Sequence, residues 1–271
     1  MKYFHLHELV PYVDCALLDQ HTIKTNQHYK FSGFTLENNP SDVTTQLYNS
    51  SIVYIHPDAY EQWINILDIL NEKKPMNIKT VIICGSDYCI DNNSLSPLLE
   101  IFPNTKFFVE NWIGQHEHVE LLPIGVNEDY LKPITKEKLC GISYASNNST
   151  DREEFQKYID TTESLQRYVI PKLPRGEYLE ELSKCYFSVC TAGNGYDTLR
   201  FWESLMVKAI PIVEKNEFID NLQLHYPDIP MIVLEHWEEL DQKLLELDEG
   251  VYTRLWKEND VCLTEYWINK L

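Results

Sequence analysis

The chain has 271 residues, of which 44% are hydrophobic and 12% aromatic, and it carries a formal net charge of −19 at pH 7. This composition is typical of a folded globular protein with enough length for one large domain or two small ones. The acidic balance argues against a general nucleic-acid-binding protein, because phosphate backbones require a basic face. No apolar run approaches the roughly 20 residues that a membrane span needs, and the N-terminus lacks the apolar core of a signal peptide. We therefore expect a soluble, cytoplasmic protein without a membrane span.

Strand-like and helix-like segments alternate through the first half of the chain. Runs of β-branched and aromatic residues predict strands, and apolar residues at helical spacing predict helices. The expected strands are Ser51–His56, Thr80–Cys84, Lys106–Val109 and Val119–Leu122, with a possible further strand at Tyr29–Leu36, and the expected helices are Tyr60–Leu70 and Ser96–Ile101.

The alternation restarts after residues 123–135, where we place the joint between two consecutive α/β units. The expected strands are Gly141–Ala145, Arg167–Ile170, Phe187–Cys190, Ala209–Val213 and Met231–Leu234, and the expected helices are Asp151–Asp160, Gly176–Lys184, Thr198–Lys208 and Tyr252–Leu271. A βα alternation of this kind predicts parallel sheets with helices on both faces. The predicted fold class is therefore α/β, with two Rossmann-type βαβ domains.

The segment from residue 190 to residue 213 is the most informative part of the sequence. It predicts a strand, a glycine turn, a short helix and a second strand. Gly193 and Gly195 allow backbone geometries that a side chain would block, and Asp197 or Thr198 suits the N-cap of the helix. The start of that helix directs free N–H groups and the positive end of its dipole into the turn. A phosphate group would bind well there.

Three polar residues of the same helix share one face. Asp197, Arg200 and Glu203 follow each other at three-residue spacing. A guanidinium group suits phosphate oxygens, and a carboxylate suits the hydroxyls of a sugar. Together with the turn, these residues predict a nucleotide-sugar site. Two simpler readings stay open: Arg200 could form an ion pair with Asp197, and Glu203 could be a solvated surface residue.

This segment resembles the donor-binding motif of exostosin-like glycosyltransferases, including their compact viral and bacterial members. The matching residues are Gly193, Asn194, Gly195, Asp197, Thr198, Arg200, Trp202, Glu203 and the Ile-Pro-Ile-Val run at 210–213. The chain departs from the family pattern at Thr191-Ala192, where the family has Pro-Arg, and at Leu199, where it has His. The strong similarity covers about a tenth of the chain.

The resemblance implies a GT-B fold, in which two Rossmann-type domains face each other across a cleft. It also implies transfer of a sugar from a nucleoside-diphosphate sugar to a hydroxyl of a glycan acceptor. The reaction would be inverting and metal-independent, with no cofactor besides the donor. The domains would be residues 1–127 on the acceptor side and residues 128–250 around the nucleotide sugar. A C-terminal helix at 251–271 would pack back on the first domain or cap its own.

Every arginine of the chain lies beyond residue 150. The five are Arg152, Arg167, Arg175, Arg200 and Arg254. Arginine is the side chain best shaped for forked phosphate contacts, and we assign Arg152 and Arg200 to the ligand and the other three to structure. The polar loop before Arg152 resembles a Ser-rich loop of the family and would bring Ser146 to the donor. Arg152 would then complement the β-phosphate as the leaving group gains charge, although Asp151 and Arg152 could instead open a helix at the surface.

Three titratable residues of the first half follow predicted strands directly. They are His56, Asp87 and Glu110, and ligands of open α/β sheets bind beyond the carboxyl ends of strands. An inverting transferase needs one base that takes the proton of the acceptor hydroxyl. Asp87 is the first choice, because Gly85-Ser86 loosens the chain there. His56 and Glu110 are the alternatives, and Asp87 could also be an ordinary turn or N-cap residue.

No metal site is predicted. The seven cysteines lack the spacing of a zinc site, and those in apolar strands are expected to be buried, reduced thiols. His5-x-His7 and His116-x-His118 could grip a metal, but no carboxylate motif accompanies either pair. No Asp-x-Asp motif follows a strand, which argues against a metal-dependent transferase of the other major fold.

Two other classes of protein remain to be weighed. The departures at Thr191-Ala192 and Leu199 would suit a non-catalytic nucleotide- or glycan-binding subunit, which would bind donor without turnover. A nicotinamide dehydrogenase is the weaker rival, because its fingerprint requires a third glycine where this chain has Thr198.

Overall fold

The computed structural model describes the chain except for residues 1, 5–7, 19–39, 128, 131 and 144–149. The chain divides into two compact units. The N-terminal unit consists of His5–Ile124 and the last segment, Thr264–Leu271. The C-terminal unit consists of Gly125–Leu263 and the first segment, Met1–Phe4. The division thus falls between Ile124 and Gly125, where the sequence places it after residue 127.

The N-terminal unit is built on a sheet of parallel strands whose spatial order follows the chain. The strands are β1 (Cys15–Leu17), β2 (Ile52–Ile55), β3 (Thr80–Ile83), β4 (Lys106–Val109) and β5 (Val119–Leu121). The helical elements are η2 (Val10–Tyr12), α2 (Pro40–Asn49), η3 (Pro57–Ala59), α3 (Tyr60–Lys73), α4 (Asn92–Ile101) and α12 (Thr264–Ile268). Strand β1 and helix α2 are not predicted by the sequence, and the possible strand at 29–36 lies wholly outside the described residues.

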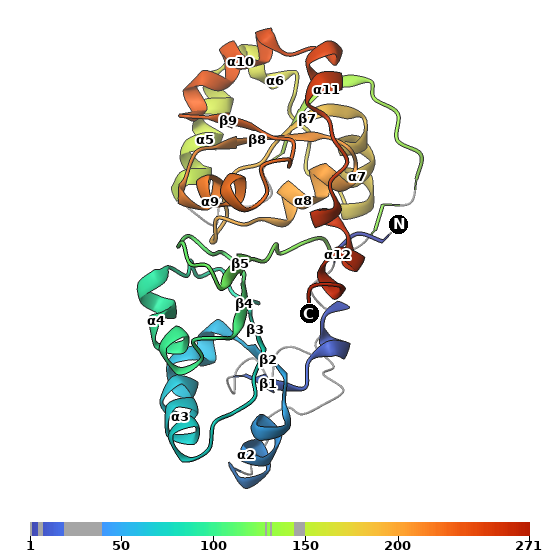
Figure 1. Cartoon of the computed structure of the whole chain (residues 1–271). Helices are drawn as coiled ribbons and strands as arrows, with labels where there is room; N and C mark the ends of the chain where they lie inside the picture. Colours follow the sequence, from blue (N-terminus) through green and yellow to red (C-terminus); the bar gives the residue numbers. More distant parts are fainter. Residues whose placement is uncertain (1, 5–7, 19–39, 128, 131, 144–149) are drawn as a thin grey trace. The chain divides into compact units, whose positions relative to one another are not determined.

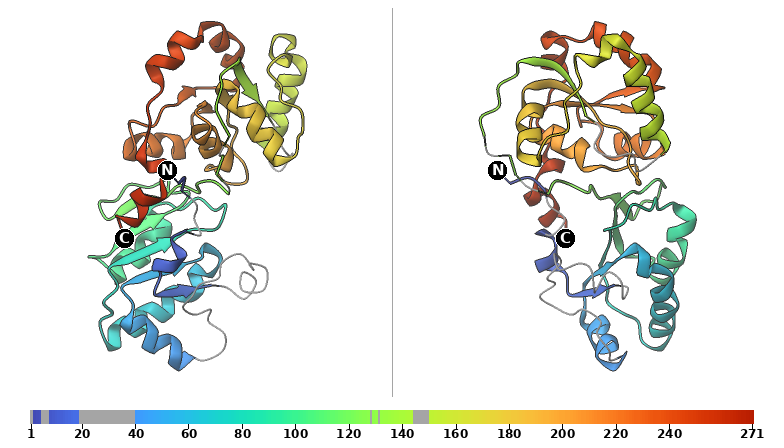
Figure 2. Two further views of the ribbon diagram at one scale, coloured as in Figure 1. Left: turned by 90° about the vertical axis from the view of Figure 1, so that its right-hand side faces the viewer. Right: turned by 180° about the vertical axis from the view of Figure 1, so that it is seen from behind.

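Both faces of this sheet are covered. Because parallel strands in sequential order are joined by crossovers of one hand, α3 and α4 lie on the same face, as Figure 1 shows. On the opposite face lies α12 (Figures 1 and 2). Its Trp267 is buried and meets Phe108 of β4 edge to face, with ring centroids 5.9 Å apart.

The predicted C-terminal helix over Tyr252–Leu271 is wrong as a single element. The structure has α11 (Glu249–Leu255), η5 (Asp260–Cys262) and α12 in its place. Extended backbone at Trp256 ends α11, and Asn259 caps η5 by accepting a hydrogen bond from the N–H of Val261. Asn and Asp favour caps over helix interiors, so the chain breaks where they cluster. Only the last piece, from Thr264, belongs to the N-terminal unit.

The C-terminal unit contains a second parallel sheet, in the order β6-β7-β8-β9. The strands are β6 (Lys138–Ile142), β7 (Cys185–Val189), β8 (Ile210–Glu214) and β9 (Ile232–Leu234). The remaining helices are α5 (Thr150–Thr161), α6 (Glu163–Gln166), α7 (Arg175–Ser183), α8 (Leu199–Met206), α9 (Glu217–His225), η4 (Trp237–Glu239) and α10 (Leu240–Glu246). Helices lie on both sides of this sheet (Figure 2). The predicted class, an α/β protein with two parallel-sheet units, is confirmed.

The predicted strand at Arg167–Ile170 is reduced to a single bridge. Val169 pairs in parallel with Ile142 of β6, through hydrogen bonds from the Ile142 N–H to Tyr168 and from the Ile170 N–H to Ile142. Strand β7 pairs with the other edge of β6. The chain therefore leaves β6 toward one side and returns to the other side to form β7.

Candidate functional site

The connections around β6 and β7 mark a topological switch point. After β6 the chain moves to the Val169 bridge, and after β7 it moves in the opposite direction to β8. In open α/β sheets, ligands bind outside the carboxyl ends of the strands where the connections diverge in this way. Here that position is occupied by Ser143 after β6 and by residues 190–198 after β7, which we call the motif loop.

Arg152 lies directly on the motif loop. Its Nε donates a hydrogen bond of 2.7 Å to the carbonyl oxygen of Ala192, and the N–H of Gly193 donates to the carbonyl oxygen of Gly195 at 2.9 Å. A Cβ atom on Gly193 would stand 2.8 Å from Arg152 Nη2. Neither Gly193 nor Gly195 has a positive φ. The glycine at 193 therefore leaves room for the close approach of the guanidinium group, and its backbone conformation does not itself call for glycine.

Helix α8 begins directly after the motif loop. Thr198 is its N-cap in extended conformation, and the Thr198 side chain makes no capping hydrogen bond. Asp197 is 4% exposed and accepts a hydrogen bond of 2.7 Å from the indole Nε1 of Trp202. The Asp197 carboxylate thus fixes the first turns of α8 in the ligand-free protein.

Arg200 remains available for an anion. Its Nη1 donates to the hydroxyl of Thr191 at 3.3 Å. Within the described part of the chain, no carboxylate lies at ion-pair distance from Arg200, so the alternative pairing with Asp197 is not formed. Thr191 is one of the two residues at which the motif departs from the family pattern, and its hydroxyl orients the arginine.

Glu203 is not a solvated surface residue. It is 3% exposed, and its Oε1 lies 2.5 Å from Nη2 of Arg175, the first residue of α7. The sequence assigns Arg175 to structure, and nothing in its spacing from the motif marks it as a neighbour. Its position directly after Pro174 at the start of a predicted helix is the one available signal.

Tyr178 joins the same group from the next turn of α7. Ser143 Oγ donates to its phenolic oxygen at 3.5 Å. Burial is the main cause that raises the pKa of Tyr178 to about 12, with Arg200 acting to lower the pKa and Glu203 to raise it. The phenol is therefore neutral at physiological pH and can donate a hydrogen bond.

A cavity of about 170 Å³ lies on the β8 side of the motif loop, within the C-terminal unit. Aromatic side chains of Phe201, Phe218 and Trp237 line it, and Thr191 and Thr198 contribute polar atoms. Of the other predicted donor residues, Asn194 is exposed, and Ser146 lies outside the described residues. The cavity, Arg152, Arg200 and Glu203 thus surround one loop.

The N-terminal unit has its own polar cluster at the carboxyl ends of β2, β3 and β4. The N–H of Gly85 donates to Glu110 Oε2 at 2.5 Å, and the carbonyl oxygen of Gly85 lies 3.0 Å from His56 Nε2. The N–H of Asp58 donates to His56 Nδ1, so Nε2 carries the ring proton and donates to Gly85. Asn111 Nδ2 donates to the carbonyl oxygen of Ser86 at 3.2 Å.

The three predicted candidates for the base differ in burial and in hydrogen bonding. His56 and Glu110 are 4% and 3% exposed, and both hold the backbone of Gly85. Asp87 is exposed on the loop that they hold. Of the three candidates, Asp87 is the one whose side chain is exposed.

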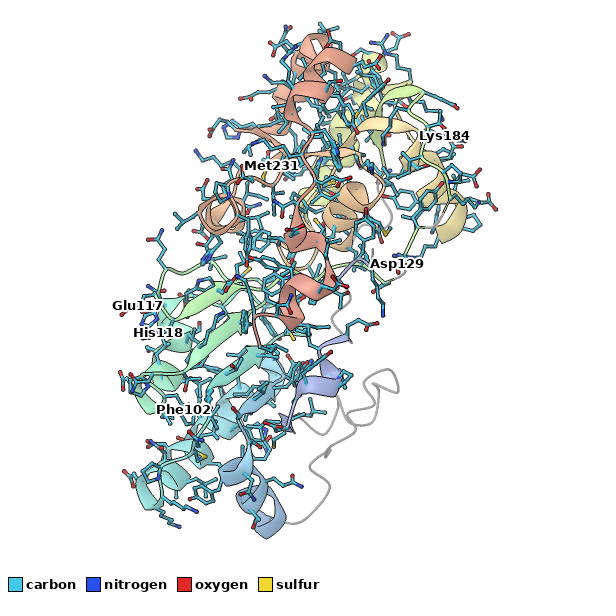
Figure 3. The ribbon with its side chains drawn as sticks, turned by 45° about the vertical axis from the view of Figure 1, so that its right-hand side comes forward. Phe102, Glu117, His118, Asp129, Lys184 and Met231 are labelled. Atoms are coloured by element: carbon cyan, nitrogen blue, oxygen red, sulfur yellow. The ribbon has the colours of Figure 1, made fainter. Side chains whose placement is uncertain are left out.

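The candidate histidine pairs give no metal centre among the described residues, where no group of three or more His, Cys, Asp and Glu side chains could hold an ion. Figure 3 labels His118 beside Glu117 at the edge of the N-terminal unit. The N–H of His118 donates to His116 Nδ1. His5 and His7 lie outside the described residues. None of the helices in the described ranges combines the length and apolar character that a bilayer span requires.

Comparison with known proteins finds similarity among solved structures. No protein-family model matches the sequence, and no curated protein matches it. Among solved structures, the chain is similar to a protein described as the glycotransferase of kitacinnamycin, with 12% identity and a TM-score of 0.41. The similarity covers 82% of this chain and 80% of that one. At this level the likeness carries no functional argument, and function must be argued from the residues.

Proposed function

We propose that this protein is a glycosyltransferase that moves a sugar from a nucleoside-diphosphate sugar to a hydroxyl of a glycan acceptor. The observation that carries the proposal is the meeting of Arg152 with the motif loop at the switch point of the second sheet. These two segments are 40 residues apart in the chain, and only a fold that brings them together would create an anion site from both.

The donor diphosphate would bind between Arg152 and Arg200. Both guanidinium groups lie against the motif loop, on Ala192 and Thr191. The uncapped start of α8 adds N–H groups and the positive end of a helix dipole. This local positive charge offsets the field of a chain whose net charge is −19. Glu203 would accept hydrogen bonds from hydroxyls of the ribose or of the transferred sugar.

The transfer itself would be an inverting displacement without a metal. The acceptor oxygen forms a bond to the anomeric carbon while the bond from that carbon to the diphosphate oxygen breaks. Asp87 would take the proton of the acceptor hydroxyl, and Arg152 and Arg200 would stabilise the charge that develops on the departing diphosphate. The exposure of Asp87 supports its choice over the two buried candidates.

A ligand screen tests the proposal. The purified protein is melted with a panel of nucleoside diphosphates and nucleotide sugars in the presence of a chelator. A ligand at 100 times its dissociation constant stabilises a protein by about 2.7 kcal/mol, which shifts the melting temperature by a few degrees. We expect one selective shift that chelator does not affect and that Arg200→Ala abolishes.

The matched control is Arg254→Ala, which removes an exposed arginine from α11 of the same unit. It should leave the ligand-induced shift intact. An unaltered shift in Arg200→Ala would refute the residue assignment. Binding of a nucleotide sugar without turnover would favour a non-catalytic subunit. Ala192 is the reason to consider this alternative, because it provides no cation at the position where the family has Arg. A shift with nicotinamide cofactors alone would favour the dehydrogenase.

A further inference from the structure

Glu203 forms a buried ion pair with Arg175. The carboxylate is almost entirely removed from water, at 3% exposure of the residue. A buried carboxylate stays ionised only where hydrogen bonds and an opposite charge replace its hydration. Arg175 supplies both, with Nη2 at 2.5 Å from Oε1. Among the residues that the structure describes, no other Lys, Arg or His side chain lies at ion-pair distance from Glu203.

The pair joins two helices at the switch point. Arg175 is the first residue of α7, and Glu203 lies on α8, one turn beyond Arg200. Tyr178, one turn into α7, interacts with both Arg200 and Glu203. The Arg175 side chain is 37% exposed, against 4% for the side chain of Glu203. Arg175 is therefore the partly exposed member of the pair, and Glu203 is the buried one.

The three arginines of this edge have different partners. Arg152 holds Ala192, Arg200 donates to Thr191, and Arg175 holds Glu203. A carboxylate has about four lone-pair positions on its two oxygens, and the contact with Arg175 uses one oxygen. The remaining positions can accept hydrogen bonds from two neighbouring hydroxyls. Without the hydrogen bond from Arg175, the carboxylate would lose the contact that fixes its orientation and would accept them poorly.

We propose that Arg175 is a positioning residue of the donor site, which fixes the Glu203 carboxylate so that it accepts hydrogen bonds from the vicinal hydroxyls of a ribose. The inference rests on the proposed function, because it takes the ligand to be a nucleotide. It assigns a specificity role to a residue outside the motif: the protein distinguishes ribonucleotides from deoxyribonucleotides through the Arg175–Glu203 pair.

The test compares four ribonucleoside diphosphates (ADP, CDP, GDP and UDP) with their 2′-deoxy forms, by calorimetric titration of the whole chain. The wild-type protein should bind the preferred ribonucleotide roughly tenfold or more tightly than its deoxy form, as expected for one hydrogen bond to a charged group. In Arg175→Gln the ratio of the two affinities should fall to near one, because binding of the ribonucleotide is weakened while the affinity for the deoxy form stays unchanged. Arg175→Lys keeps the charge and should restore part of the preference.

The outcomes separate structural from specific effects. If Arg175 served folding alone, Arg175→Gln would weaken the binding of both nucleotides by the same factor, and that result would overturn the inference. An unchanged preference for the ribonucleotide in Arg175→Gln would also overturn it. If Arg175→Gln does not fold, Arg175→Lys decides: equal weakening of both nucleotides there would overturn the inference, and a reduced preference with unchanged affinity for the deoxy form would support it. Arg254→Ala is the control and should behave as wild type. Equal binding of ribo and deoxy forms by the wild type overturns this inference alone, whereas no binding of any nucleotide overturns the proposed function with it.

Discussion

The two sheets end in polar loops that use their side chains in opposite ways. In the N-terminal unit, His56, Glu110 and Asn111 are all engaged in holding the backbone of Gly85 and Ser86. In the C-terminal unit, the side chains that hold the motif loop are guanidinium groups, each of which has five N–H donors. The first edge is thus closed on itself, with the Asp87 carboxylate exposed on the loop that it holds. The second edge is held together by the same groups that can bind an anion.

The largest expected effect concerns Asp87, the exposed carboxylate on the loop of the N-terminal unit. Asp87→Asn should lower the rate of sugar transfer by about 10²–10⁴-fold, because a general base is lost. Donor affinity and stability should not change, since Asp87 is exposed. Single-turnover transfer and nucleotide titration measure the two quantities separately.

Glu110→Gln is the control for this experiment. The amide oxygen can still accept the N–H of Gly85, so transfer should persist if Glu110 only holds the loop. An active Asp87→Asn protein together with an inactive Glu110→Gln protein would move the base to Glu110.

The next prediction concerns the packing around Gly85 in the polar cluster of the N-terminal unit. Gly85 has φ of +100°, and a Cβ atom there would stand 2.8 Å from the hydroxyl of Tyr54, which donates to the carbonyl of Cys84. Gly85→Ala should therefore lower the free energy of unfolding by up to about 3 kcal/mol. Gly176→Ala in α7 is the matched control: nothing lies within 4 Å of its added Cβ, and it should stabilise by about 0.5–1 kcal/mol. Urea titration measures both, and equal effects of the two substitutions would contradict the strained geometry.

The smallest effect concerns the buried thiols that precede the two loops. Burial raises the pKa of Cys190 from 9.0 to about 11, although Ser204 and Arg200 lower it. Since the pKa of the folded state exceeds that of the unfolded chain, this thiol stabilises the fold fully below pH 9. The contribution is lost as the pH rises toward 11.

Between pH 8 and pH 10.5 the loss amounts to about 2 kcal/mol. Cys190→Ser removes the titrating group, so the difference in unfolding free energy between wild type and variant should shrink by that amount over this range. A constant difference across the range would show that the thiol pKa is not raised. For Cys84 burial and the nearby Glu110 raise the pKa well above 9.0, so its contribution should persist to higher pH.

Local pattern was sufficient to predict most of the sheets and the motif loop. The strands with four or more consecutive buried β-formers, such as Thr80–Ile83, were located from the sequence to within a few residues. Strand β1 (Cys15–Leu17) is too short for an alternating pattern. The segment around Val169 has strand composition but meets only one partner residue. Short strands form only where a neighbouring strand provides pairing partners, and a local stretch of sequence does not show which partners are near in space.

The contacts of the site depend on long-range packing and could not be predicted. Arg175 and Glu203 are 28 residues apart, and their pairing follows from the packing of α7 on α8. The same holds for Glu110 and Gly85, 25 residues apart. The resemblance to a motif marked Glu203 as functional, but it gave no information on which cation accompanies a buried carboxylate.

The ends of the chain are exchanged between the units, and this has a consequence for biosynthesis. Trp267, which covers Phe108 of the first sheet, follows all strands of the second sheet in the chain. Tyr3 and Phe4, which precede the first sheet, pair with Leu263 and Cys262. The packing of the first sheet is therefore completed only after the second unit has been synthesised, and a fragment cut between Ile124 and Gly125 would expose an aromatic face of the first sheet. Hybrid proteins that combine units from different relatives must carry these terminal segments with the unit that each one completes.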